Sequence, residues 1–337
     1  MTKRPIDRVR DSGGSMTFGT DGDAGEIDGM FEINGSLHTI MTKAIFVTKL
    51  ADEIDPDRTN IGIPNVSQKV LDVGTDAAYV RSILMQANRL FKDKVLGPDF
   101  DYQAAMNLSF EVLKDVVGLE QTRQSVRAKL TAIEDDIKAL KVDPQRRQLA
   151  VPAVGDVWGL VEAFSQRADH AVMDLFKIAK LFYGRELDKG WFTALRDKVK
   201  ASYGPDDQFT KFMEAVLPFL LFVRNLRNAV EHADESKRVV VTDITLGPDG
   251  NLKPPTIEVI HRDTPQPETH LLQFLDRIVD HLVRIFEQMI VHMSARHVQP
   301  QAGMPLELGP FTPDQARAYK CSYGYGCWFG DQWAPFG

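Results

Sequence analysis

The segment Phe222–His232, "FVRNLRNAVEH", gathers the side chains in this chain that are best suited to chemistry. In a helix of about 3.6 residues per turn, its polar residues fall on one side and its apolar residues on the other. We call that side the polar face; it comprises Arg224, Asn225, Arg227, Asn228, Glu231 and His232. The segment follows a strongly apolar run, "FMEAVLPFLLFV", so a buried helix is expected to hold the face in place.

An ordinary solvated helix surface is the simplest alternative for the polar face. Arg227 and Glu231 are four residues apart, which is the spacing of a common helical ion pair. A solvated surface is usually built from Lys and Glu, however, whereas the polar face has no lysine and includes the poor helix formers Asn225 and Asn228. Guanidinium and amide groups present fixed donor geometry, which suits recognition of phosphate oxygens. We therefore favour a binding or reaction site, and the solvated surface stays open.

The residue types match the needs of RNA cleavage. RNA carries its own nucleophile, the 2′-OH, so a cleaving site needs a group that transfers protons near neutral pH and a cation for the charge on phosphorus. His232 would transfer the proton, and Arg227 would bind phosphate oxygens. Asn228 would either fix the tautomer of the His232 ring or hold a phosphate oxygen. Arg224 is a second candidate phosphate contact. This chemistry requires no metal, and we expect no cofactor.

Helices and one hairpin are predicted to position the polar face. After Asp156, a good N-cap, apolar residues recur at steps of three and four up to Phe182, which predicts a long helix that ends at Gly184. Further helices are expected over about 191–202, 207–232, with a kink or restart at Pro218, and 268–297. Between the last two, "RVVVTDITL" and "TIEVIHR" are β-branched runs that predict a β-hairpin.

The rest of the chain is predicted to be helical or irregular. Residues 1–35 are rich in Gly and Asp without an apolar period and are expected to form a disordered tail. Residues 36–145 are expected to be an N-terminal helical region, with helices over about 36–54, from Thr75 onward, over 102–117 and over 120–141. Residues 298–337 are rich in Pro, Gly and aromatics; we expect an extended arm whose aromatics dock on the body or on a partner. The predicted fold class is therefore all-α.

The pattern Arg-Asn-x-x-x-His, formed by Arg227, Asn228 and His232, resembles the HEPN (higher eukaryotes and prokaryotes nucleotide-binding) superfamily. The resemblance covers residues 152–297 and implies a HEPN-like all-α helical bundle with the hairpin inserted before its last helix. It also implies activity, since many members are metal-independent ribonucleases of toxin–antitoxin, CRISPR-associated and abortive-infection systems. Members are often dimers, and a homodimer is expected here because one histidine can hardly make both proton transfers, whereas a twofold axis would supply two.

Composition sets limits on the class of protein. Apolar residues at 43% and charged residues at 26% are typical of a globular protein. A formal charge of −7 argues against a protein that coats nucleic acid without specificity, but it allows a small basic site. No apolar run is long enough to span a membrane and no secretory signal is visible, so we expect a cytoplasmic protein. Cys321 and Cys327 are expected to be reduced thiols, and no metal-ligand set emerges.

Two hypotheses follow for the function. The first is a HEPN-type endoribonuclease, a toxin or antiphage-defence effector, with RNA as substrate and an antitoxin or another defence protein as a partner. The alternative is a HEPN-like module without catalysis, which serves as a nucleotide-binding or protein-interaction scaffold. The acidic balance of the chain favours the alternative slightly. The surroundings of Arg227 and His232 distinguish them: a groove shared across a dimer suits an enzyme, and packing against the chain's own hairpin suits a scaffold.

Overall fold

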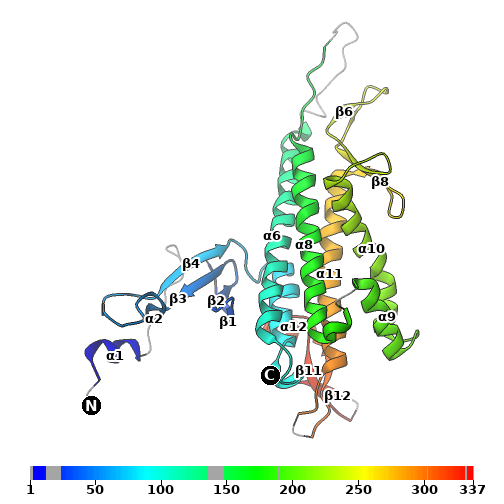
Figure 1. The fold of residues 1–337 in the computed structure, drawn as a ribbon. Coiled ribbons are helices and arrows are strands. Elements are labelled where there is room, and N and C mark those ends of the chain that lie inside the picture. The colour runs from blue at the N-terminus through cyan, green and yellow to red at the C-terminus, as the bar shows by residue number, and fades with distance from the viewer. Residues whose placement is uncertain are drawn as a thin grey trace. The chain divides into compact units, whose positions relative to one another are not determined.

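The computed structural model describes residues 3–12, 24–135, 148–187, 190–301, 303–330 and 332–336 (Figure 1). Contacts divide the chain into two compact units. The first unit comprises residues 1–110 and 294–337, and the second unit comprises residues 111–293. Two long helices, α6 (Tyr102–Ala132) and α11 (Leu271–His297), contribute residues to both units.

The protein has a mixed α/β fold, so the all-α prediction is wrong. In the described residues the strands form four antiparallel sheets, and the largest of them has four strands. No helix within the described ranges is long and apolar enough to cross a membrane.

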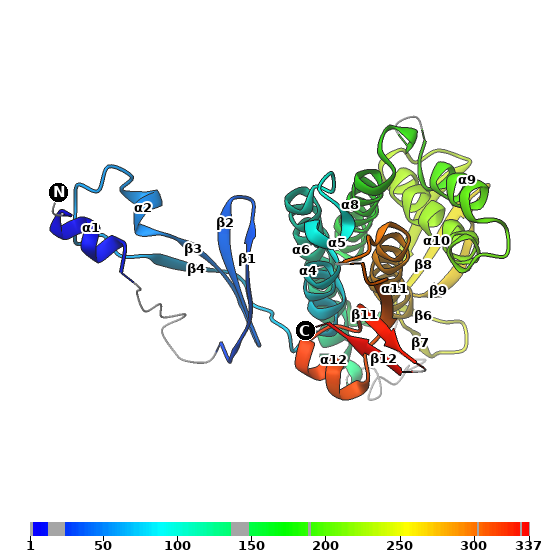
Figure 2. The same ribbon diagram turned by 90° about the horizontal axis from the view of Figure 1, so that it is seen from below.

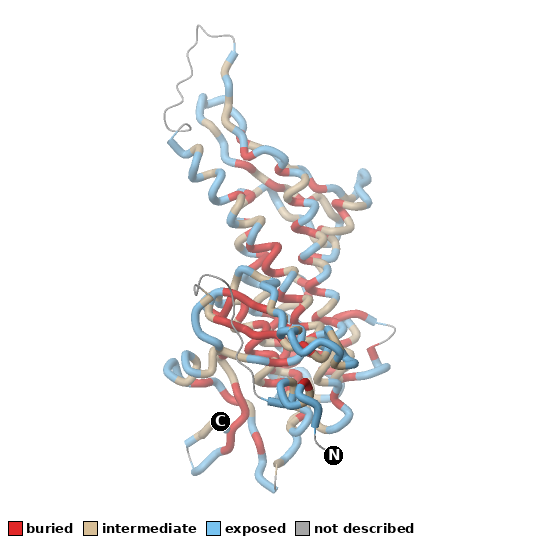
Figure 3. Tube along the Cα trace, turned by 90° about the vertical axis from the view of Figure 1, so that its left-hand side faces the viewer, coloured by how far each residue is buried: buried red, intermediate tan, exposed pale blue. Residues whose placement is uncertain are grey.

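The second unit contains the helices that the sequence predicted around the polar face. They are α8 (Val157–Tyr183), α9 (Phe192–Tyr203) and α10 (Gln208–Glu231), next to most of α6 and α11. Figures 1 and 2 show α6, α8, α10 and α11 running alongside one another. Exposed and buried stretches alternate along these helices, as expected for helices that each turn one side to a core (Figure 3).

Local signals explain where α8 and α10 begin and end. The Asp156 carboxylate accepts the Gly159 N–H at 3.2 Å, and α8 ends at Gly184, which has a positive φ. Asp207 caps α10 in the same way, through the N–H of Phe209. Helix α10 continues through Pro218, so the restart expected there does not occur. Pro218 lies on the exposed side, where the carbonyl that loses its helical partner can be hydrated.

The predicted hairpin is confirmed and is part of a larger sheet. Strand β5 (Lys237–Thr242) pairs with β8 (Thr256–His261), and β8 also pairs with β9 (Gln266–His270). Within the β5–β8 connection, β6 (Thr245–Leu246) pairs with β7 (Leu252–Lys253). The helix expected from 268 therefore begins later, at Leu271.

The first unit departs most from the prediction. This unit contains a meander of β1 (Ile27–Ile33), β2 (Ser36–Met41), β3 (Ile45–Lys49) and β4 (Val66–Leu71), and β2 and β3 replace most of the helix that was expected over 36–54. The apolar residues of β2 and β3 recur at steps that imitate a helix because both faces of these strands are partly buried. The overlooked signal was Asn34-Gly35: both residues have positive φ and form the tight turn between β1 and β2.

Apart from α6, the remaining helices of the N-terminal region are short. In the described residues they are α1 (Pro5–Arg10), α2 (Ala51–Ile54), α3 (Ala78–Val80), η1 (Arg81–Met85), α4 (Gln86–Leu90) and α5 (Asp93–Leu96). The helices predicted over 102–117 and 120–141 are one helix, α6, as far as Ala132. Residues 13–23 of the predicted tail and 136–141 of the predicted helix lie outside the described residues. The described parts of 1–35 include α1 and β1, so they are not the irregular tail that we expected.

The described part of residues 298–337 contains strands and a helix, so the extended arm is also wrong. Strands β10 (Glu307–Pro310), β11 (Tyr323–Phe329) and β12 (Gln332–Pro335) form an antiparallel sheet, and α12 (Pro313–Tyr319) connects the first two. Glycines in β11 make room for aromatic rings, since a Cβ at Gly324 would lie 2.2 Å from Phe311 Cζ. The sheet therefore derives its packing from aromatic and glycine pairs rather than from alternating apolar residues.

A buried amide attaches this C-terminal sheet to α4. The side chain of Gln86 is fully buried; its Oε1 accepts the N–H groups of Ser322 and Tyr323 at 2.9 and 3.0 Å. Its Nε2 donates to the Tyr323 carbonyl at 3.1 Å. One side chain thus satisfies three backbone groups of the segment that enters β11.

We predict that Gln86→Leu lowers the free energy of unfolding by about 2 kcal/mol, because it leaves buried backbone groups without partners. Urea unfolding checks the stability, and limited proteolysis checks whether residues 298–337 become accessible. The same substitution at the exposed Gln68 of β4 serves as the control. Equal stability of Gln86→Leu and the wild type would contradict the role assigned to this amide.

Candidate functional site

The polar face occupies the C-terminal half of α10. Helices α8 and α9 and strands β5 and β8 contact α10. Val223, Leu226 and Ala229 are completely buried, whereas Arg224 and His232 are exposed and Arg227 is half-buried. The structure therefore separates the two sides of this helix as the sequence predicted.

Arg227 and His232 both lie near Glu231. The Arg227 guanidinium forms an ion pair with Glu231 Oε2 at 2.5 Å. His232 is the C-cap residue of α10, and its backbone N–H donates to the Asn228 carbonyl at 2.9 Å. Its imidazole is 65% exposed, with Nε2 3.9 Å from Glu231 Oε2. His232 is therefore accessible to a ligand, while part of the charge of Arg227 is neutralised within its own helix.

Asp169 of α8 is a member of the site that sequence reasoning missed. Burial raises the pKa of this carboxyl, and the positive charges of Arg227, His170 and Arg224 partly oppose the rise. Its Oδ1 is buried and has no hydrogen-bond partner among the described residues. The signal that could have pointed to Asp169 is its place on the helix, one turn after Ser165. Ser165 is fully buried, so an acidic side chain at position 169 falls at the edge of the core.

Arg224 lies against an aromatic ring. Its guanidinium carbon is 5.2 Å from the centre of the Trp191 ring, at the start of α9. Trp191 is buried, so the ring limits where the arginine side chain can go. Stacking on an aromatic face leaves the in-plane N–H donors of a guanidinium available to another ligand.

The two asparagines have different surroundings. Asn225 donates from Nδ2 to Thr264 Oγ1 at 3.2 Å, which joins α10 to the loop between β8 and β9. Thr264 Oγ1 is in turn 3.3 Å from His261 Nδ1. Within the described part of the chain, no hydrogen bond joins the Asn228 amide to the His232 ring. The tautomer-fixing role considered for Asn228 thus has no support in this structure, and its amide is available for a phosphate oxygen.

The structure brings Arg224, Arg227 and Asp169 into one electrostatic group, with His232 at its exposed end. Only Asn225 connects the polar face to the loop of the β5–β8–β9 sheet through a side-chain hydrogen bond among the described residues. The face is thus neither wholly open nor packed under the hairpin. Its donors and its titratable imidazole can reach an anion that approaches from solvent.

A second carboxyl with a raised pKa, that of Asp115, lies on α6, and the charge of His170 acts on it as it does on Asp169. Burial raises the pKa of Asp115 to about 6, with His170 and Arg167 opposing the rise and Asp174 adding to it. An acid whose pKa is raised by folding stabilises the fold while it is protonated. That contribution is complete below the unfolded pKa of about 3.8 and is lost as the pH rises through about 6.

We therefore predict that Asp115→Asn becomes more stable relative to the wild type as the pH rises from 4 to 7. The expected change in the difference of unfolding free energies is about 1 kcal/mol, since partial exposure screens the charge. Urea unfolding at several pH values measures it, with Asp99→Asn as an exposed control. A difference that stays constant across this range would contradict the assignment.

Comparisons of this chain with protein-family models, with curated proteins and with solved structures found no match.

Proposed function

We propose that the chain is a metal-independent endoribonuclease of the HEPN type. The observation that carries the proposal is the exposed His232 imidazole at the end of a helix face that presents the guanidiniums of Arg224 and Arg227. A titratable group and two cations on one rigid helix are the elements that phosphate-ester cleavage in RNA needs.

The reaction begins with attack of an RNA 2′-oxygen on the adjacent phosphorus. The 2′-OH proton passes to a base, the bond between phosphorus and the 5′-oxygen breaks, and the departing oxygen takes up a proton. The products are a 2′,3′-cyclic phosphate and a 5′-OH. Neutral His232 acts as the base and protonated His232 as the acid, while Arg227 and Arg224 stabilise the negative charge on the phosphoryl oxygens.

The ion pair of Arg227 is compatible with phosphate binding. A guanidinium has five N–H donors, and Glu231 occupies the Nη2 side. The remaining donors can bind a phosphate oxygen without breaking the pair. The negative charge of Asp169 acts on both arginines, so it favours a single position of these long side chains before substrate arrives.

The proposed enzyme is a homodimer. In an in-line displacement the attacking 2′-oxygen and the departing 5′-oxygen lie on opposite sides of phosphorus, so one imidazole can hardly reach both to transfer their protons. A twofold axis near the exposed end of α10 would bring a second His232 to the same phosphate. The exposure of His232 is compatible with this arrangement.

The biological setting is proposed on the resemblance alone. A nuclease of this type would act as a toxin or as an antiphage-defence effector in the cytoplasm. It would require an antitoxin or another defence-system protein to restrain it in the absence of attack.

The second candidate is a non-catalytic scaffold that binds nucleotides or proteins. One observation favours it: Glu231 pairs with Arg227 at 2.5 Å and Asp169 adds a further negative charge, so the polar face is less basic than its sequence suggests. In that case the face would bind a ligand weakly and would leave RNA intact.

Incubation of the protein with a mixed RNA pool in the presence of EDTA tests the enzyme. The wild type is expected to cleave RNA and to leave cyclic-phosphate ends. His232→Ala should lower the rate at least about 100-fold, the usual contribution of a general acid–base group. Arg227→Lys keeps the charge but loses the fork-shaped donor geometry, and we expect a loss of about tenfold or more.

His270→Ala is the matched control, because His270 is an exposed histidine of β9 that does not belong to the polar face. It should cleave at the wild-type rate. Equal activity of His232→Ala and the wild type would point to a contaminating nuclease and would refute the assignment. If the wild type and every variant are inactive and the wild type still binds RNA, the scaffold is supported instead.

A further inference from the structure

The first unit contains a cavity that the proposed nuclease chemistry does not use. Its volume is about 280 Å³, near the lower end of the roughly 300–1,000 Å³ typical of small-molecule pockets. Residues from α4, from α5 and its approach, and from the C-terminal segment line it: Arg89, Lys92, Val95, Gln301, Met304, Leu306, Tyr325 and Phe336. All of them belong to the first unit.

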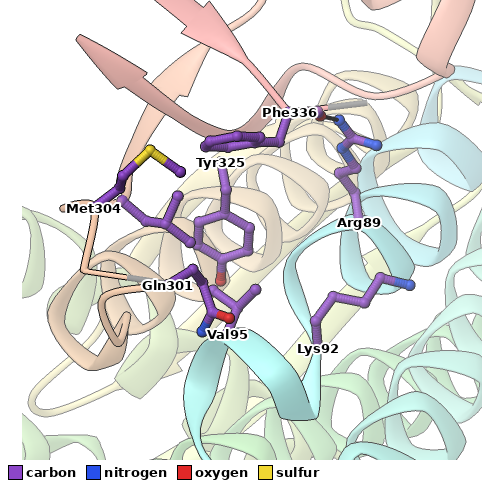
Figure 4. Close-up of a pocket in the computed structure, with 8 residues that line it drawn as sticks. Arg89, Lys92, Val95, Gln301, Met304, Tyr325 and Phe336 are labelled. Atoms are coloured by element: carbon purple, nitrogen blue, oxygen red, sulfur yellow. Dashed lines mark hydrogen bonds between the residues drawn. The ribbon is translucent and has the colours of Figure 1, made fainter.

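Most of the lining is apolar. Figure 4 shows the Tyr325 ring in the middle of the group, with Phe336 beside it and Met304 on one side. The Tyr325 hydroxyl donates to the Leu90 carbonyl at 2.8 Å, so the polar end of this residue is already satisfied by the protein. The cavity therefore presents the hydrocarbon part of Tyr325 to a ligand, and apolar surface of this kind favours a ligand with an apolar body.

Two cations lie on the other side of the Tyr325 ring, at Arg89 and Lys92 (Figure 4). In the part of the chain that the structure describes, neither has a carboxylate within ion-pair distance. The Arg89 guanidinium donates to the Phe336 carbonyl and lies 4.6 Å from the centre of the Tyr319 ring. The Lys92 ammonium donates to Asn88 Oδ1 at 3.3 Å. Neutral acceptors and π faces thus hold both charges.

The surroundings of Lys92 disfavour the charged form of its amino group. Burial lowers its pKa, and the nearby charge of Arg89 lowers it further, while Asp93 acts in the opposite direction. An anion in the cavity would relieve both unfavourable contributions. The local charges of Arg89 and Lys92, less that of Asp93, leave a net charge of about +1, which a monoanion would neutralise.

We propose that this cavity binds a small carboxylate with an apolar, ring-sized body. The carboxylate lies against Lys92 and Arg89, and the body lies against Tyr325, Met304 and Leu306. A monoanionic carboxylate fits the charge better than a phosphate dianion, and its two oxygens suit two adjacent donors. The inference is independent of the nuclease proposal, because no residue of the polar face takes part.

Titration calorimetry with phenylbutyrate and with phenylbutanol, its neutral counterpart, tests the proposal on the full chain. We expect the carboxylate to bind about tenfold tighter than the alcohol or better, which is the effect of one charge-assisted contact. Lys92→Gln should weaken phenylbutyrate binding about tenfold while leaving phenylbutanol binding unchanged. Lys94, an exposed lysine of α5, the helix that Lys92 precedes, provides the matched control: Lys94→Gln should bind both as the wild type does.

A second variant tests the location by shape rather than by charge. Met304→Trp places a large ring at the partly exposed rim, where it should fill the cavity and abolish binding of both compounds. Circular dichroism and the melting temperature establish that each variant is folded. The proposal is overturned if the alcohol binds as tightly as the carboxylate or if neither compound binds at millimolar concentration. It is also overturned if Lys92→Gln leaves the ratio of the two affinities unchanged.

Discussion

The partly buried carboxylate of Asp169, on α8, is the constraint on which the candidate site depends. Removing the charge of Asp169 from water is unfavourable, and the raised pKa of this group shows that the protein compensates only in part. The compensating charges come from Arg227, His170 and Arg224, so the fold is more stable when both guanidiniums stay on this side of α10. The unfavourable burial of Asp169 thereby orients Arg227 and Arg224, the groups that a phosphate would meet.

The geometry of the helices transmits this constraint to His232. Side-chain caps at Asp156 and Asp207 set where α8 and α10 begin, and the apolar side of α10 sets its rotation against the core. His232 then follows the last helical residue, beyond the buried core, where the imidazole is exposed. A titratable group is most useful at such a place, since it is held by a rigid element and remains accessible to solvent and to a second copy of the chain.

The sequence predicted the helices of the second unit well because each is long and buries one side, so its apolar period is clear. The prediction failed for strands whose apolar residues do not follow a simple period. Strands β2 and β3 bury parts of both faces, and β11 packs through glycine and aromatic pairs. The same limit applies to the site: Arg227, Asn228 and His232 are adjacent in sequence and could be found there. Asp169 joins them only through the packing of α8 on α10.

The central claim is that the polar face promotes attack by an RNA 2′-oxygen, and one measurement tests it most directly. An RNA oligonucleotide that the protein cleaves at a defined position is compared, in EDTA, with the same oligonucleotide carrying a single 2′-deoxy nucleotide on the 5′ side of that bond. The account predicts that the modified bond remains intact while the protein still binds the strand. Cleavage of the modified bond at the original rate would contradict it, because the nucleophile would then have to come from elsewhere.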